Sequence, residues 1–222
     1  MLARQLEPSK LFETFLRAVS SYGKSFILTW ASGWLIALST RIVIGGPPNS
    51  GKSTLAESLA RALRSLGVDA YAEDLDLASP TLEFIRGTKG WEKRQGSKKE
   101  WTPKLAEKAA ALFEEASTKH AVVIGDAPGK ITGESKTIAQ KADYAIILCR
   151  EDCKNEIMNW SKFFSKLDIP IICVAISKLT GDEDVEKSSG IIKATLVGLD
   201  RKAKTDQVMT SLAALIKEKL GL

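Results

Sequence analysis

The stretch GGPPNSGKST, residues 45–54, carries the residue types best suited to chemistry. Gly46, four intervening residues and then Gly51, Lys52 and Ser53 match the pattern G-x-x-x-x-G-K-[ST] in full. In this pattern backbone N–H groups fold around a β-phosphate, the lysine bridges the β- and γ-phosphates, and the hydroxyl coordinates Mg²⁺. The sequence therefore predicts a nucleotide-binding loop whose contacts come from Gly46, Pro47, Pro48, Asn49, Ser50, Gly51, Lys52, Ser53 and Thr54.

A second stretch, VVIGDAPG at residues 122–129, is an apolar run that ends in an acid. An aspartate at the end of a strand beside a phosphate loop holds the Mg²⁺ of the nucleotide. We expect Asp126 and Ser53 to form the metal site, with Asp126 acting through water. The Gly129 amide is expected near the γ-phosphate.

Two further carboxylates, Asp74 and Asp76, occur in the stretch EDLDLASPT at residues 73–81. A carboxylate beside a transferring phosphoryl group can orient the attacking oxygen or help to hold the metal. We expect one of the two to act with Lys52 in catalysis. Asp76 is the first choice and Asp74 the second, because the sequence does not fix which one faces the metal.

These residues must be positioned by a regular scaffold, and the pattern after residue 40 predicts one. Short apolar runs alternate with longer amphipathic runs, which is typical of a parallel sheet with crossover helices. All three chemical stretches follow predicted strands, at the edge where such folds bind ligands. Strands are predicted at 41–46, 68–74, 120–126, 143–149, 169–177 and 192–200, and helices at 51–66, from 102, and at 135–141, 155–167 and 205–220.

The three stretches together resemble the P-loop NTPase class that includes MinD/ParA ATPases, dethiobiotin synthetase and CobQ-type enzymes. The resemblance covers roughly residues 41–220 and rests on the order of the motifs. It implies a three-layer α/β P-loop NTPase with a mostly parallel central sheet and flanking helices, binding ATP and Mg²⁺. A looser resemblance is to the P-loop domain fused to some CRISPR-associated ring nucleases, through the loop and the stretch NWSKFF at 159–164.

Two departures from that class bear on the nucleotide and on assembly. The MinD/ParA loop has an additional lysine that acts across a dimer, whereas Pro47 and Pro48 stand in that stretch here. A dimer bridged by that lysine is therefore not expected. The stretch AISKLTG at 175–181 is similar to the [NT]-K-x-D guanine motif, but Thr180 replaces the aspartate that would read guanine. ATP is favoured over GTP.

The segment 86–104 is the most basic part of the chain, with seven lysines and arginines against two glutamates. Trp91 and Trp101 are interleaved with these cations. Cations and a stacking ring suit a phosphorylated or nucleotide-like acceptor beside the γ-phosphate. An ordinary solvated loop with both tryptophans folded onto the core is an equal alternative, and a nucleic-acid partner is a further one.

The segment 1–40 is expected to be a helical or apolar extension ahead of the domain 41–222. Its apolar run 26–38 is shorter than a bilayer-spanning helix requires. A helix packed on the domain and a start site placed too early are together favoured over membrane association through residues 25–39. Three cysteines are too few for a disulfide framework, so a reducing, cytoplasmic location is expected.

Two functions fit these observations. The first is a kinase-like phosphotransferase that moves the γ-phosphoryl group of ATP to a small or nucleotide-like acceptor. The second is an ATP-hydrolysing switch, similar to MinD/ParA, that recruits a protein, membrane or nucleic-acid partner. The net charge of +5 suits an anionic partner in either case and does not separate them.

Overall fold

The chain divides into two units, Met1–Leu38 and Ser39–Leu222. The computed structural model describes residues 28–30, 34–36, 39–90, 99–200, 202–204 and 206–222. In the first unit, β1 (Leu28–Trp30) and β2 (Trp34–Ile36) pair as antiparallel strands, so the described residues of the apolar run 26–38 are extended rather than helical. The domain boundary predicted at residue 40 and the membrane alternative stay predictions. Within the described residues, no helix combines the length and apolar character needed to cross a bilayer.

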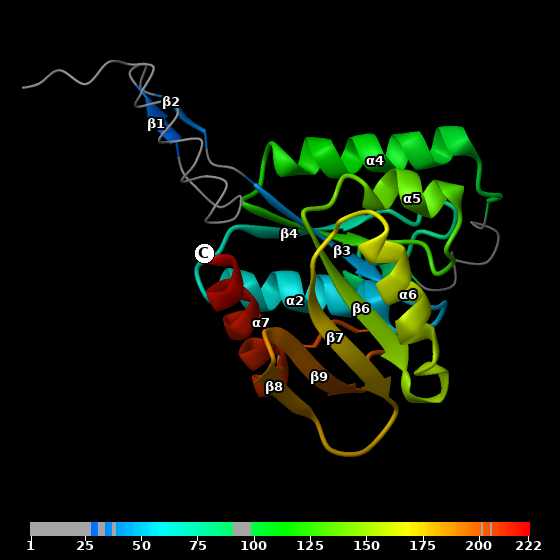
Figure 1. Ribbon diagram of the computed structural model, residues 1–222, viewed down its shortest axis with the longest axis vertical. Helices are drawn as coiled ribbons and strands as arrows, with labels where there is room; N and C mark the ends of the chain where they lie inside the picture. The colour runs from blue at the N-terminus through cyan, green and yellow to red at the C-terminus, as the bar shows by residue number, and fades with distance from the viewer. Residues whose placement is uncertain (1–27, 31–33, 37–38, 91–98, 201, 205) are drawn as a thin grey trace, which may run out of the picture. The chain divides into compact units, whose positions relative to one another are not determined.

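The second unit is organised around a seven-stranded sheet with the order β4-β5-β3-β6-β7-β9-β8 (Figure 1). Every neighbouring pair is parallel except the edge pair of β8 and β9. The strands are β3 (Thr40–Gly45), β4 (Ala70–Asp74), β5 (Val122–Asp126), β6 (Tyr144–Arg150), β7 (Ile171–Lys178), β8 (Asp184–Ser188) and β9 (Ile191–Val197).

Helices cover both faces of this sheet. One apolar cluster joins the sheet to α2 (Lys52–Ser65) and α7 (Gln207–Leu220). Two other clusters join the opposite face to α4 (Pro103–Ser117), α5 (Gly133–Ala139) and α6 (Glu156–Ser165). Two short elements, α3 (Leu82–Ile85) and the 3₁₀ turn η2 (Glu151–Cys153), complete the described part. The predicted three-layer α/β architecture is confirmed.

The central strands are apolar on both sides because both sides are covered. In β3, Ile42 and Ile44 pack in the α2 and α7 layer, whereas Val43 packs in the cluster that contains α6. All three side chains are fully buried. Consecutive apolar residues of this kind are typical of a doubly covered parallel strand.

The structure contains two elements that were not predicted, and one predicted strand ends earlier than expected. β8 was not expected, since Val185 is its only apolar residue and the strand lies at an exposed edge. The helix α3 was also missed, because four residues are too few to show helical periodicity. The last strand ends at Val197 rather than at residue 200, and a turn with Gly198 at φ +67° follows.

Candidate nucleotide-binding site

The phosphate loop leaves β3 and enters α2 through positions where only glycine fits. A Cβ atom on Gly46 would lie 1.8 Å from the carbonyl oxygen of Leu148 on the neighbouring strand β6. Gly51 has φ +91°, in the left-handed region that favours glycine, and caps the amino end of α2. The backbone of the loop is therefore held tightly against β6, with the amino end of α2 behind it, as an anion-binding loop requires.

Lys52 lies inside this loop and is 7% exposed. Its Nζ donates a hydrogen bond of 2.9 Å to the carbonyl oxygen of Pro47, which also accepts a 2.9 Å bond from the Ser50 hydroxyl. Burial lowers the pKa of Lys52, and the nearby carboxylates of Asp126 and Asp76 act in the opposite direction. The loop thus holds its cation folded back on its own backbone, where phosphate oxygens could replace the carbonyl.

Asp126 ends β5, directly beside the last residues of β3. The register pairs Ile44 with Asp126, and Ser53 donates a side-chain hydrogen bond to the carboxylate. Burial raises the pKa of Asp126 to about 7, with a further increase from Asp74 and a decrease from Lys52. A hydroxyl and a buried carboxylate in contact form an oxygen donor set that fits Mg²⁺, whose charge would offset this cost of burial. The structure thus brings the two predicted metal residues together.

Asp74 and Asp76 have different surroundings, although they are two residues apart. Asp74 Oδ2 accepts hydrogen bonds from the backbone N–H groups of Thr81 (2.6 Å) and Leu82 (2.9 Å), which start α3. Its Oδ1 is buried and has no hydrogen-bond partner among the described residues. Burial raises the pKa of Asp74 to about 6, although the two amides act to lower it. Asp74 therefore orders the start of α3.

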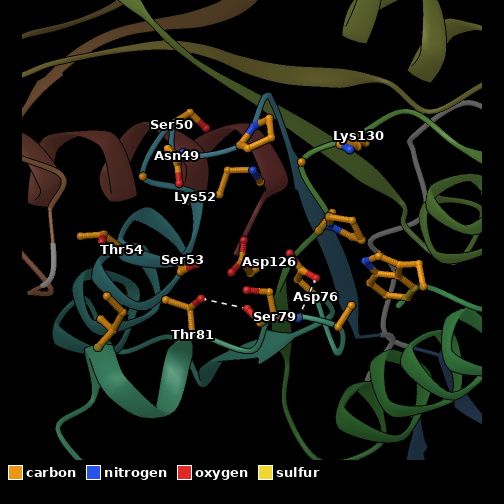
Figure 2. Close-up of a pocket in the computed structure, with 18 of the residues that line it drawn as sticks. Asn49, Ser50, Lys52, Ser53, Thr54, Asp76, Ser79, Thr81, Asp126 and Lys130 are labelled. Atoms are coloured by element: carbon orange, nitrogen blue, oxygen red, sulfur yellow. Dashed lines mark hydrogen bonds between the residues drawn. The ribbon is translucent and has the colours of Figure 1, made fainter. Parts of the chain in front are cut away.

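Asp76 instead faces the cavity in front of the phosphate loop. Its Oδ1 accepts a 3.2 Å hydrogen bond from the backbone N–H of Ser79, and its charge acts to raise the pKa of Lys52. Figure 2 shows Lys52, Asp126 and Asp76 around the same space. Of the two carboxylates between which the sequence left the choice open, Asp76 is the one placed to meet a bound nucleotide; its catalytic role stays a prediction.

Gly129 lies against the phosphate loop. A Cβ atom at this position would stand 2.7 Å from the nitrogen and 2.8 Å from the Cα of Pro48. The backbone after β5 is therefore packed against the front of the phosphate loop. An amide that meets a γ-phosphate would be placed in this way, and this role of Gly129 stays a prediction.

Most of these groups border one cavity of about 940 Å³. Such a volume lies at the upper end of the range for small-molecule sites. Predicted nucleotide and metal residues that line it are Pro48, Asn49, Ser50, Gly51, Lys52, Ser53, Thr54, Asp76, Asp126 and Gly129. Gly46 and Pro47 support the loop from behind, and Asp74 supports α3.

Further lining residues were not identified as site residues from the sequence. Lys130 follows Gly129, and Leu199 and Asp200 follow β9. The Thr54 hydroxyl donates to the carbonyl oxygen of Asp200, which ties the turn after β9 to α2. Their position after the carboxyl ends of strands was the one available signal. Of the basic segment 86–104, residues 91–98 lie outside the described residues, while Lys99 and Trp101 line the cavity.

Comparison with known proteins adds information on the fold. Neither the family models nor the curated proteins give a match. The cell division ATPase MinD of Pyrococcus furiosus is a similar solved structure, with TM-score 0.52 and 13% identity over 79% of this chain and 80% of that one. The septum site-determining protein MinD of Pyrococcus horikoshii OT3, complexed with Mg-ADP, has TM-score 0.50 and 16% identity over 63% of this chain and 70% of that one.

The fold is that of a P-loop NTPase. The predicted resemblance to MinD-type proteins is thus confirmed at the level of the fold. The 54 kDa signal recognition particle protein of Aeropyrum pernix K1, complexed with GDP, is also similar, with TM-score 0.51 and 16% identity over 96% of this chain and 52% of that one. One of these similar folds binds ADP and another binds GDP, so the fold alone does not indicate whether a bound nucleotide carries adenine or guanine. The looser resemblance to ring-nuclease-fused domains stays a prediction.

Proposed function

We propose that the protein is a Mg²⁺-dependent, ATP-binding phosphotransferase. The observation that carries the proposal is the convergence of Lys52, Asp126 and Asp76 on one cavity in front of a tightly packed phosphate loop. Lys52 begins α2, Asp126 ends β5, and Asp76 lies in the loop after β4. The pKa values of Lys52 and Asp126 are both shifted, and groups with shifted pKa values in a cavity are typical of a functional site.

Each side chain has a defined task in this proposal. The loop amides and Lys52 bind the phosphates and neutralise charge that develops on the transferring group. Ser53 and Asp126 would hold Mg²⁺, which supplies further charge neutralisation on the phosphate oxygens. Asp76 orients the attacking oxygen from the opposite wall of the cavity. We favour ATP because Thr180 cannot accept hydrogen bonds from guanine as an aspartate does, and it is exposed outside the cavity lining.

A transfer assay with ATP labelled at the γ-phosphate tests this proposal. The full chain is incubated with Mg²⁺ and pools of metabolites, nucleotides or oligonucleotides. We expect labelled acceptor to form and Lys52→Ala to abolish it. The control Lys108→Gln changes an exposed lysine on α4, outside the cavity, and should keep the wild-type rate.

Two other outcomes are informative. Label that appears only as free phosphate would refute transfer and support the ATP-hydrolysing switch. Equal turnover by wild type and Lys52→Ala would contradict the assignment of the site itself. Competition with unlabelled GTP measures the base preference, and displacement of ATP by equimolar GTP would argue against the choice of adenine.

A further inference from the structure

The cavity extends beyond the residues assigned to ATP. Three further segments line it, one after β4, one ahead of α4 and one after β5. Their lining residues are Ala78, Ser79, Thr81, Lys99, Glu100, Trp101, Lys130, Thr132 and Glu134. A 2.8 Å hydrogen bond from the Lys99 backbone N–H to the carbonyl oxygen of Ala78 joins the first two segments. The third continues from Gly129, which packs on Pro48. We call the part of this one cavity that the three segments line the outer compartment.

Trp101 gives this compartment an aromatic wall. It packs against the apolar cluster that contains Leu75 and Phe113, and it also lines the cavity. The indole is therefore supported by the core on one side and available to a ligand on the other. A supported indole is a surface on which a nucleobase can stack, and such stacking tolerates any base.

Lys99 and Lys130 supply two cations to the compartment, and Glu100 and Glu134 supply an equal number of carboxylates. Both are exposed, both line the cavity, and neither forms an ion pair within the described part of the chain. Lys130 directly follows Gly129, which packs against Pro48 of the phosphate loop. A lysine binds phosphate as a point charge. The carboxylates of Glu100 and Glu134, which also line the cavity, suit the hydroxyl and amino groups of a nucleoside.

From this arrangement we propose that the outer compartment binds a nucleoside monophosphate as the phosphoryl acceptor. Its base stacks on Trp101, and its phosphate lies between Lys130 and the γ-phosphate. The inference rests on the proposed function, because it gives the transferred group a destination. It uses only described residues of the segment 86–104.

The transfer balances without a base, so with this acceptor Asp76 would help to hold Mg²⁺ rather than orient a hydroxyl group. A phosphate oxygen of the monophosphate forms a bond to the γ-phosphorus of ATP. The bond from the γ-phosphorus to the β,γ-bridging oxygen breaks, and ADP leaves with that electron pair, so the products are ADP and a nucleoside diphosphate. The attacking phosphate is already largely a dianion at neutral pH, since the second pKa of a phosphate monoester is about 6. Lys130 and Lys99 reduce the repulsion between the two phosphates.

Direct binding tests this inference independently of turnover. AMP, GMP, CMP and UMP are each titrated calorimetrically into the full chain with Mg²⁺, both with and without a non-hydrolysable ATP analogue. We expect one site whose affinity falls about tenfold in Lys130→Gln, which removes a charge-assisted contact. Trp101→Ala should weaken binding by about tenfold or more, whereas Trp101→Phe should keep most of it. Lys136→Gln, an exposed lysine on α5 outside the cavity, should bind as wild type.

Several outcomes would overturn the inference. These are the absence of binding by all four monophosphates, equal binding by wild type and Lys130→Gln, and equal affinity for nucleosides that lack the phosphate. Lys130→Gln changes an exposed side chain and keeps the test valid if Trp101→Ala does not fold. Failure of the proposed function would give a different result, because the ATP analogue itself would not bind. The titrations without the analogue would then still show whether the chain binds a nucleoside monophosphate.

Discussion

The two ends of the cavity are built differently. At the inner end, Lys52 and Asp126 are buried, and neighbouring backbone lies within contact distance of a Cβ atom placed on Gly46 or Gly129. At the outer end, Lys99 and Lys130 are exposed. Geometry at the inner end is therefore fixed by close packing, where a single added atom cannot be absorbed. The outer end can change its side chains with little effect on the fold, which suits the part of a site that selects the acceptor.

The largest expected effect comes from one methyl group at the inner end. Gly46→Ala places a Cβ atom 1.8 Å from the Leu148 carbonyl oxygen at φ +149°, so the loop or β6 must move. We expect the free energy of unfolding to fall by more than about 3 kcal/mol, together with loss of ATP binding. Urea unfolding and nucleotide titration measure the two effects.

The matched control for this variant is Gly67→Ala. Gly67 has φ +81° with nothing within 4 Å of the added Cβ, so it isolates backbone strain from the clash. Gly67→Ala should lower the free energy of unfolding by about 1 kcal/mol and leave nucleotide binding intact. Equal effects of the two variants would contradict the idea that close packing distinguishes the inner end.

The contrast between the two ends also explains what could be predicted from the sequence. The parallel sheet and the positions of the loop and Asp126 at its edge were predictable because each follows from local spacing: glycines beside a lysine, and apolar runs that end at one edge. The binding roles of the loop and Asp126 stay predictions. The sequence could not separate Asp74 from Asp76. Their difference depends on the amides of Thr81 and Leu82, which belong to a helix of only four residues.

The outer end depended on contacts between distant segments and was harder to predict. Trp101 was recognised as part of a basic segment, but its packing on the cluster that contains Phe113, and its place in one cavity with Lys130, depend on segments distant in the sequence. Lys130 has no pattern of its own beyond its place after Gly129. β8 was missed for a related reason, since an exposed edge strand needs little apolar pattern to form.

The next effect concerns the charge of Asp126 at the inner end. Its pKa is about 7 in the folded chain against 3.8 in the reference state, so the folded protein binds more protons between these values. The free energy of unfolding without Mg²⁺ should therefore fall as the pH rises from about 4 to 7. The change is a few kcal/mol at most, since one pKa unit corresponds to about 1.4 kcal/mol.

Asp126→Asn provides the test of this pH dependence. The variant should be more stable than wild type at pH 7.5 without Mg²⁺, with a flatter pH profile, and it should lose Mg²⁺-dependent turnover. Asp182→Asn, at an exposed position, should keep the wild-type profile. Denaturation at a series of pH values checks both, and a wild-type stability that rises toward pH 7 through this group would contradict the prediction.

The smallest effect is expected where the two ends are joined. Arg86, directly after α3, donates a 2.8 Å bond to Glu57 on α2, whose side chain is 5% exposed, and a second bond to the carbonyl oxygen of Ala72. The guanidinium also lies 4.9 Å from the centre of the Tyr71 ring. Arg86 thereby joins the segment that contains Thr81 and α3, which forms one wall of the cavity, to α2, which begins at the phosphate loop.

Arg86→Ala should lower the free energy of unfolding by about 1 to 3 kcal/mol. This is less than the cost of leaving a buried charge without any partner, because Arg61 still binds Glu57 at 2.8 Å. Arg86→Lys should cost less than the alanine variant, since it keeps the charge but loses the fork. Because the wall carries Ser79 and Thr81 beside Asp76, turnover should fall while the affinity for ATP changes little. A variant that lost ATP affinity and turnover equally would show that Arg86 supports the inner end as well, and that the two ends are not independently held.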